Sequence, residues 1–251
     1  MHTNSEDEVR RHFGGLRVAI TGGTSGLGLA LVREFLNRGA RVAFMARHRD
    51  SVANVTLEHP GSHGIAGDVS TRDDIHPIAI QIVAALGGLD VLINNASDLG
   101  PTPLALLADT DCEDLERTLA TNLLGPFRLT KALLGALAAS AREGRGAVVL
   151  NVSSDAAINA YPRWGAYGVS KAALHHLSRI WNEELTAEGI AVLSLDPGDM
   201  DTPMHAMAVP DSDRTELKRP ETAAQEFADA VGKLLAFMKR DCQPALQEAV
   251  R

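Results

Sequence analysis

The sequence predicts an α/β fold in which helices cover both faces of a doubly wound parallel sheet. Short apolar segments alternate with amphipathic ones along nearly the whole chain. Several of the apolar segments are continuous runs, which is typical of parallel strands buried on both faces. A glycine-rich turn also joins the first apolar segment to the first amphipathic one, as in a strand–turn–helix unit.

The predicted strands and helices fill the chain in alternation, and the sequence shows no internal repeat or linker. The strands are expected at residues 16–20, 41–46, 62–66, 89–93, 147–152 and 190–195. The helices are expected at residues 27–38, 72–86, 111–142, 167–188 and 220–238. Residues 200–219 form a polar segment rich in Met, Asp and Pro. It follows the last predicted strand, where α/β enzymes place ligand-binding loops.

Composition favours one catalytic domain over residues 15–251, preceded by a flexible tail at residues 1–14. The chain has 251 residues, of which 45% are hydrophobic, and that length suits a single α/β domain. A net charge of −8 argues against a nucleic-acid partner. No apolar run is long enough to span a membrane, and the polar start lacks a signal peptide, so we expect a cytoplasmic protein. Cys112, Cys242 and the histidines show no disulfide or metal spacing.

The glycine turn at residues 21–28 is a candidate phosphate-binding site. Glycines allow a tight turn and a close approach of the backbone to a pyrophosphate, and the amides of a helix N-terminus then bind the phosphates. A glycine-rich turn alone is weak evidence, because many such turns bind nothing. The candidate cofactor-binding residues here are Gly22, Thr24, Ser25, Gly26, Leu27 and Gly28.

A tyrosine and a lysine four residues apart form the candidate catalytic pair. Tyr167 and Lys171 lie on one face of the predicted helix, with Ser154 upstream. A phenol with a pKa of about 10 exchanges protons poorly at neutral pH, but a nearby ammonium lowers that pKa. The alternative is a half-buried helix tyrosine beside a solvated lysine. The glycine turn and Ser154 favour the catalytic interpretation.

These motifs, in this order, resemble the short-chain dehydrogenase/reductase family in its compact single-domain form. The resemblance covers residues 15 to 235 and rests on the glycine turn, Asn94-Asn95-Ala96, Asn151-Val152-Ser153-Ser154 and Tyr167-Gly168-Val169-Ser170-Lys171. It implies a Rossmann fold and a nicotinamide cofactor. The further cofactor-binding residues that it implies are Asp68 and Val69 at the adenine, Asn94 and Ala96 at a strand end, Tyr167 and Lys171, and Pro197, Gly198 and Thr202 at the nicotinamide.

The resemblance also assigns the catalytic roles. Tyr167 is the acid/base, Ser154 donates a hydrogen bond to the substrate oxygen, and Asn122 holds a water that links Lys171 to solvent. Family spacing favours Ser154 over Ser153, which is expected to pack against the sheet. Asp68 could instead cap a helix, which is the alternative to its role at the adenine. His175 and His176 receive no catalytic role.

The end of the second strand predicts NADP in preference to NAD. In NAD-using relatives an acidic residue there binds the adenosine ribose, and this chain has Ala46 at that position. Arg47 follows, and its planar guanidinium is suited to a 2′-phosphate. The alternative is an ordinary surface arginine.

Three features depart from the family pattern. Ser97 stands where relatives usually have glycine, and is expected to narrow the pocket or contact the substrate. The usual C-terminal strand is hard to find, since residues 243–251 hold only a weak apolar stretch. That puts family-type contacts at this edge in doubt. Residues 200–219 match no substrate type.

The predicted function is hydride transfer between NADP(H) and a small carbonyl or alcohol substrate, in a homodimer or homotetramer. Two helices with apolar residues on more than one side support the oligomer. One alternative is a non-catalytic NADP-binding sensor or regulator on the same fold, and the other is a nucleotide-sugar epimerase or dehydratase. The intact catalytic set argues against the first, and the absence of room for a substrate domain argues against the second. The expected pocket residues are Ser97, Asp98, Trp164, Met200, Met204 and His205.

Overall fold

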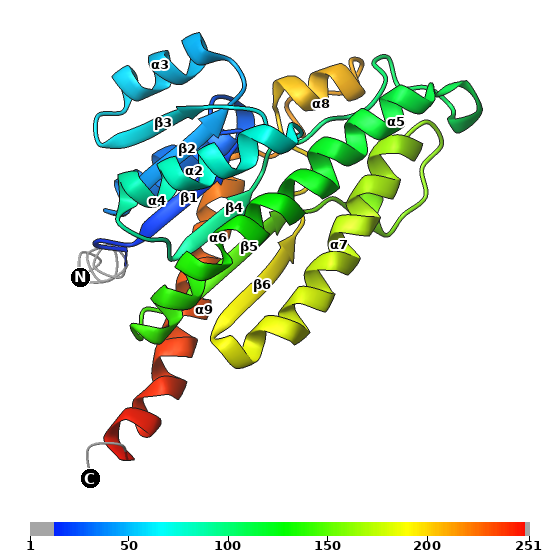
Figure 1. Ribbon diagram of the computed structural model, residues 1–251. Coiled ribbons are helices and arrows are strands. Elements are labelled where there is room, and N and C mark those ends of the chain that lie inside the picture. The colour runs from blue at the N-terminus through cyan, green and yellow to red at the C-terminus, as the bar shows by residue number, and fades with distance from the viewer. Residues whose placement is uncertain (1–12, 249–251) are drawn as a thin grey trace.

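A parallel sheet lies at the centre of the computed structural model, which describes residues 13–248 (Figure 1). Its six strands have the order β3-β2-β1-β4-β5-β6. Their bounds are β1 Arg17–Thr21, β2 Arg41–Ala46, β3 Ser62–Ala66, β4 Val91–Asn94, β5 Ala147–Val152 and β6 Ile190–Leu195. The order reverses between β1 and β4, and ligands of open α/β sheets bind at the carboxyl ends of the strands at such a point.

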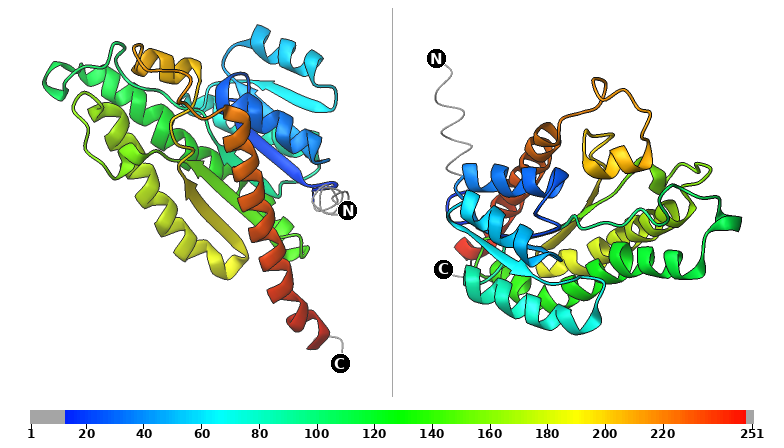
Figure 2. Two further views of the ribbon diagram at one scale, coloured as in Figure 1. Left: turned by 180° about the vertical axis from the view of Figure 1, so that it is seen from behind. Right: turned by 90° about the horizontal axis from the view of Figure 1, so that it is seen from above.

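Helices cover both faces of the sheet, which confirms the predicted fold class (Figure 2). The first face carries α2 (Gly26–Asn37), α3 (Arg49–Glu58) and α9 (Pro220–Glu248). The second carries α4 (Ile75–Leu86), α6 (Gly125–Arg142) and α7 (Gly165–Leu185). Two more helices, α5 (Cys112–Leu119) and α8 (Pro203–Ala208), lie near the carboxyl ends of the strands (Figure 1).

Alternating side chains divide each strand between the two apolar cores. In β1, Val18 and Ile20 pack against α2 and α9, whereas Ala19 faces the second layer. All three are at most 1% exposed. Burial of a Val or Ile side chain contributes about 1.5–3 kcal/mol, so the sheet is a rigid platform for the loops at its carboxyl edge.

The two ends of the chain differ from the sequence-based expectation. Phe13, which was expected to belong to the tail, is 2% exposed and packs edge-on against Phe35 at 5.6 Å, so it is part of the packed core. The predicted tail up to residue 12 lies outside the described residues. At the other end, α9 continues as a helix to Glu248, and no strand follows it within residues 13–248. Strand β6 is therefore an edge of the sheet.

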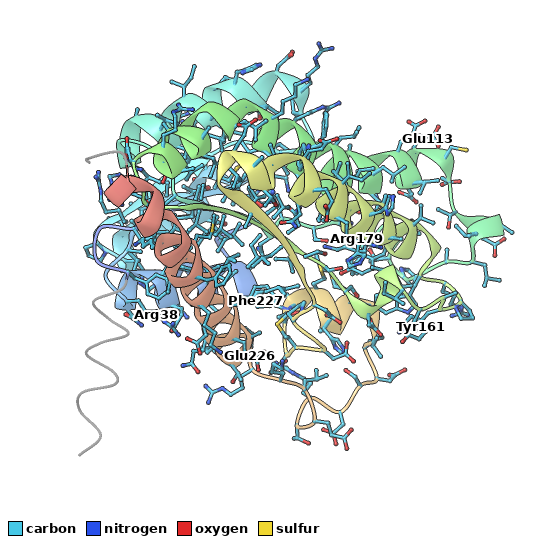
Figure 3. All side chains as sticks on the ribbon, turned by 90° about the horizontal axis from the view of Figure 1, so that it is seen from below. Arg38, Glu113, Tyr161, Arg179, Glu226 and Phe227 are labelled. Carbon is cyan, nitrogen blue, oxygen red and sulfur yellow. The ribbon has the colours of Figure 1, made fainter. Side chains whose placement is uncertain are left out.

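A salt bridge and a hydrogen bond hold the long α9 helix against α2. The Arg38 guanidinium contacts the Asp229 carboxylate at 2.6 Å and the Gln225 carbonyl at 3.5 Å. Figure 3 shows Arg38 beside this helix, well away from Tyr161. These contacts fix helix α9 to helix α2.

Helix boundaries differ from the expectation in three places. Helix α3 was not predicted, because only Val52 and Val55 of its ten residues are buried. The single helix expected at residues 111–142 is two helices, α5 and α6, joined by one π-helical turn at Ala120–Leu124. The polar segment at residues 200–219 contains α8 and a backbone bridge between Met200 and Lys218.

Candidate active site

The glycine turn between β1 and α2 is packed so closely that Gly22, Gly23 and Gly28 have no room for a Cβ. A Cβ on Gly28 would lie 2.0 Å from the Gly22 carbonyl oxygen and 2.5 Å from the Asn95 side chain. Gly22 also has a φ of +71°, a conformation that favours glycine. The turn therefore places its backbone at the surface where a ligand can reach it.

Asn95 braces this turn from β4. Its side-chain amide donates to the Thr21 carbonyl at 2.9 Å and to the Gly22 carbonyl at 3.3 Å. The Thr21 hydroxyl accepts in return from the backbone amides of Asn95 and Ala96, each at 2.9 Å. The strand ends on the two sides of the switch point are thus locked together.

The first turn of α2 leaves its amides free for an anion. Ser25 is the N-cap residue, and its side chain makes no capping hydrogen bond. The first amides of a helix have no partner within the helix, and the dipole at this end favours negative charge. This end of α2 opens into a cavity, so the site suits a pyrophosphate.

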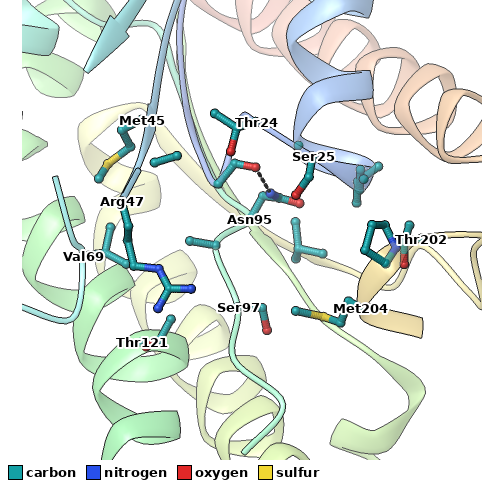
Figure 4. A pocket seen from close by; sticks show the side chains of 18 of the residues that line it. Thr24, Ser25, Met45, Arg47, Val69, Asn95, Ser97, Thr121, Thr202 and Met204 are labelled. Atoms are coloured by element: carbon teal, nitrogen blue, oxygen red, sulfur yellow. Dashed lines mark hydrogen bonds between the residues drawn. The ribbon is translucent and has the colours of Figure 1, made fainter. Parts of the chain in front are cut away.

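A cavity of about 290 Å³ runs from the glycine turn to Tyr167 (Figure 4). Most of the predicted cofactor-binding residues line it, together with several that were not predicted. The predicted ones are Gly22, Thr24, Ser25, Gly26, Leu27, Gly28, Arg47, Asp68, Val69, Ala96, Tyr167, Lys171, Pro197 and Thr202. Asn95, expected with Asn94 to brace the strand end and border the cofactor, lines it too, and unpredicted members include Met45, His48, Gly67 and Thr121.

Arg47 and Asp68 stand at the end of this cavity that is formed by β2 and β3. Arg47 is exposed, and its side chain extends past Val69 toward Thr121 (Figure 4). The Asp68 carboxylate accepts hydrogen bonds from the Ser70 amide at 2.9 Å and from the Ser70 hydroxyl at 2.8 Å. Asp68 therefore shapes its own loop while also lining the cavity.

Tyr167 and Lys171 lie in the first turns of α7 and face the ends of β5 and β6. The Lys171 ammonium donates to the Val152 carbonyl at 2.8 Å and lies 5.4 Å from the Tyr167 ring centroid. The side chains of Ser154 and Ser97 act on the Tyr167 hydroxyl, since both lower its pKa. A tyrosine hydroxyl between two serines, with an ammonium beside its ring, is suited to proton transfer.

Burial shifts both members of the pair toward their neutral forms. Burial raises the pKa of Tyr167 to about 12, and the charges of Asp196 and Asp155 act in the same direction, whereas hydrogen bonds from Ser154 and Ser97 oppose it. Burial also lowers the pKa of Lys171 to about 8, against the opposing effect of Asp196. The protein alone therefore favours a neutral phenol, which is the form that donates a proton.

Asn122 lies in the π-helical turn and holds the loop after β4. Its side-chain oxygen accepts from the Asp98 amide at 2.7 Å and from the Ser97 hydroxyl at 3.3 Å. Its side-chain amide donates to the Asp98 carbonyl at 2.8 Å and to the Ser170 hydroxyl at 2.9 Å. These contacts use all four side-chain hydrogen-bonding positions, so the Asn122 side chain is committed to the loop after β4 and to α7.

A second cavity of about 790 Å³ adjoins the first at Tyr167. Ser154 and Tyr167 line it together with the segment that follows β6. The predicted pocket residues Trp164, Met200, Met204 and His205 are found here, as is Gly198. Unpredicted members are Asp155, Tyr161, Asp196, Asp199, Ser212, Asp213 and Glu216. Asp155, Tyr161, Asp196 and Asp199 could have been predicted, because they lie close in sequence to Ser154 or to Pro197-Gly198.

Some predicted residues lie outside both cavities. Asn94 is 3% exposed, and its amide donates to Asn151 at 2.8 Å, so it braces β4 against β5. The Asp98 carboxylate turns away from the pocket, accepting from the Gly100 amide at 2.8 Å and contacting Arg117 at 3.5 Å. Ser153, expected only to pack against the sheet, borders both cavities.

Among the side chains that the structure describes, residues 13–239, no group of three or more His, Cys, Asp or Glu is arranged to hold a metal ion. In the same part of the chain, no helix combines the length and hydropathy needed to cross a membrane.

Comparisons with known proteins identify the family. A family model described as short chain dehydrogenase matches residues 17–213. Glucose 1-dehydrogenase of Gluconobacter oxydans is 31% identical over 236 residues, which cover 89% of this chain and 86% of that protein. The chain therefore belongs to the short-chain dehydrogenase family, whose members are oxidoreductases that bind nicotinamide cofactors.

Solved structures agree with this assignment. A short chain dehydrogenase from Pseudomonas syringae superposes with a TM-score of 0.81 at 29% identity, covering 88% of this chain and 90% of that one. A 3-ketoacyl-(acyl-carrier-protein) reductase from Brucella melitensis, solved with NADH, superposes with a TM-score of 0.81 at 25% identity, covering 86% of this chain and 90% of that one. These likenesses confirm the Rossmann fold.

Proposed function

We propose that this protein transfers hydride between NADP(H) and a small carbonyl or alcohol substrate, with Tyr167 as the acid/base. One observation carries the proposal: Tyr167 lines both cavities, at the point where they adjoin. The smaller cavity begins at the glycine turn, which suits the pyrophosphate of a dinucleotide. The larger cavity is then the space for a substrate that meets both the cofactor and the tyrosine.

The residues of the site supply binding, orientation and the proton. Bound NADPH supplies a hydride, which adds two electrons to the carbonyl carbon. Ser154 orients the carbonyl oxygen, and Tyr167 gives that oxygen the proton that completes the alcohol. Lys171 holds the Val152 carbonyl and keeps a positive charge beside the phenol ring. Alcohol oxidation reverses each step, and the tyrosine then accepts the proton.

The raised pKa of Tyr167 fits the direction of carbonyl reduction. A pKa of about 12 keeps the phenol protonated at neutral pH, ready to donate. Alcohol oxidation instead needs a phenolate, which the positive charge of Lys171 favours. Without bound cofactor, Tyr167 is therefore in the protonated form that carbonyl reduction requires.

The experiment is a panel of aldehydes and ketones mixed with NADPH and the purified protein. We expect loss of the reduced-nicotinamide absorbance with at least one carbonyl compound. Tight NADPH binding without consumption on any member of the panel would favour a non-catalytic sensor or regulator instead.

We further propose that Arg47 selects NADP over NAD. Its guanidinium stands at the adenosine end of the cavity, and residues 45–48 contain no carboxylate to bind ribose hydroxyls or repel a phosphate. We expect Arg47→Ala to weaken NADPH binding by about 1–3 kcal/mol, since a charge-assisted contact is lost, and to change NADH binding little. Fluorescence titration measures both affinities. Equal affinities of the wild type for the two cofactors would refute the assignment.

We also propose that a second copy of this chain covers the outer surface of α6 and α7. Phe127, Val169 and Ile180 are 36%, 50% and 43% exposed on these helices, and Phe127 stacks on Trp181 at 5.3 Å. Exposed apolar side chains on adjoining helices are typical of an interface. We expect light scattering at micromolar concentration to give the mass of a dimer or tetramer. A monomer mass there would contradict the proposal.

A further inference from the structure

The larger cavity carries an unbalanced negative charge beside the catalytic tyrosine. Five carboxylates line it, and no lysine or arginine does, among the residues that the structure describes. The carboxylates are Asp155, Asp196, Asp199, Asp213 and Glu216. Lys171 lies on the neighbouring smaller cavity and balances one of these charges at most.

The hydrogen-bond donors that hold these carboxylates are neutral and leave their charges in place. Asp155 accepts from the Tyr161 hydroxyl at 2.6 Å, and Asp196 accepts from the Gly198 amide at 2.9 Å. Asp213 accepts from the Thr215 amide at 2.9 Å. Among the side chains of residues 13–239, no salt bridge involves any of the five.

Two basic side chains of the segment between β6 and α9 form ion pairs outside the cavity. Arg214 contacts the Asp201 carboxylate at 2.8 Å, and Lys218 contacts the Glu226 carboxylate at 2.9 Å. Neither residue lines the cavity. The field that a substrate meets therefore comes from the unpaired carboxylates.

The charges act close to the place of reaction. Tyr161 has a raised pKa because it donates to Asp155, with the charge of Asp199 adding to the effect. Asp196 acts in the same way on Tyr167 and on Lys171. Asp155 and Asp196 therefore act on the catalytic tyrosine, and Asp199 lines the same cavity near Tyr161.

Aromatic rings complete the cavity wall. Trp164 packs edge-on against Tyr167 at 5.7 Å, and Tyr161 is 45% exposed at the rim. Indole and phenol rings attract ammonium groups through their negative faces, most strongly when carboxylates are near. A carboxylate or phosphate group in this cavity would meet like charge with no cation to bind it.

We propose that the substrate is a cation: an amino ketone or amino alcohol whose ammonium group lies a few bonds from the reacting carbon. The inference rests on the proposed function, because it assigns the larger cavity to the substrate. Ammonium is the group that combines attraction to carboxylates with attraction to aromatic rings.

The test uses matched ketones with NADPH at about pH 8, where an unperturbed histidine is neutral. The probes are a cationic ketone (5-trimethylammoniopentan-2-one), a neutral one (5-methoxypentan-2-one) and an anionic one (4-oxopentanoate). A separate reaction with glucose and NADP tests whether the protein oxidises a polyol instead. We expect kcat/KM for the cationic ketone to exceed that for the neutral ketone by about tenfold or more, with the anion slowest. Raising the salt toward about 1 M, where the Debye length is near 3 Å, should shrink the ratio.

Two variants test whether the preference for the cationic ketone comes from the carboxylates of the cavity. Asp199→Asn should lower the cation-to-neutral ratio by roughly threefold to tenfold, as expected for one charge at contact or near-contact distance. Asp211→Asn is the matched control, since it makes the same charge change in the neighbouring loop without lining the cavity. It should leave the ratio unchanged.

The outcomes separate this inference from the proposed function. Equal or faster turnover of the neutral or anionic ketone, or preferential oxidation of glucose, overturns the cationic substrate and leaves the oxidoreductase in place. NADPH binding with no turnover of any member overturns the proposed function itself. An equal loss of the ratio in Asp199→Asn and Asp211→Asn would show a general charge effect and contradict the assignment to the cavity.

Discussion

Replacing Tyr167 by phenylalanine should nearly abolish turnover while leaving the fold and NADPH affinity intact. The change removes only a hydroxyl, and that hydroxyl is the proposed proton donor between Ser154 and Ser97. A positioned acid/base contributes roughly 10²–10⁴-fold to the rate, so we expect kcat to fall at least that far. Steady-state kinetics on an active ketone, with NADPH titration alongside, measure both quantities.

Lys171→Ala is the informative companion to this variant. We expect it to reduce turnover and also to weaken NADPH binding, because Lys171 lines the cofactor cavity as well as contacting the Tyr167 ring. A Tyr167→Phe protein that keeps more than about a tenth of wild-type turnover would rule out Tyr167 as the acid/base.

Replacing Gly28 by alanine should cost both cofactor affinity and stability. The added Cβ would lie 2.0 Å from the Gly22 carbonyl oxygen, which is a backbone atom of the same phosphate-binding turn. Forcing an extra carbon into a packed site costs about 1–3 kcal/mol, and in a chain of this size each kcal/mol lowers Tm by roughly 2–4 °C. We expect NADPH affinity to fall by more than about tenfold, since relief of the clash must displace the amides that bind phosphate.

Gly135→Ala is the matched control, because it makes the same change within α6. No described atom lies within 4 Å of a Cβ at that position. Alanine should therefore stabilise the helix by about 0.5–1 kcal/mol relative to glycine, with NADPH affinity unchanged. Thermal unfolding and fluorescence titration distinguish the two variants. Wild-type NADPH affinity in Gly28→Ala would show that the turn does not hold the cofactor as proposed.

The sheet and the cofactor cavity were largely predictable because their signals are local. Buried parallel strands require continuous apolar runs, and a phosphate turn requires glycines at fixed spacing. Helix α3 escaped prediction because it lies over the edge of the sheet and buries only Val52 and Val55. The π-helical turn at Asn122 escaped because π-helix is rare and occurs as single turns inside α-helices, so the segment was interpreted as one continuous helix.

The substrate cavity was less predictable because its wall comes from segments far apart in the chain. Asp155 follows β5, Asp199 follows β6, and Glu216 belongs to the loop before α9. No periodicity links them, and their shared charge becomes visible only when the fold brings them together. Asp98 is the opposite case. Its place in the sequence, next to the catalytic motifs, predicted a pocket residue, but its carboxylate instead accepts a hydrogen bond from the Gly100 amide.

The most direct test of the central claim is transfer of deuterium from the nicotinamide to a substrate carbon. NADPH labelled with deuterium at both C4 positions is incubated with the wild-type protein and the ketone panel, and the products are analysed by mass spectrometry. We expect one deuterium on the new carbinol carbon, and almost none when Tyr167→Phe replaces the wild type. Tight binding of the labelled cofactor with no deuterium in any product, under conditions where the protein is folded, would contradict the proposed oxidoreductase.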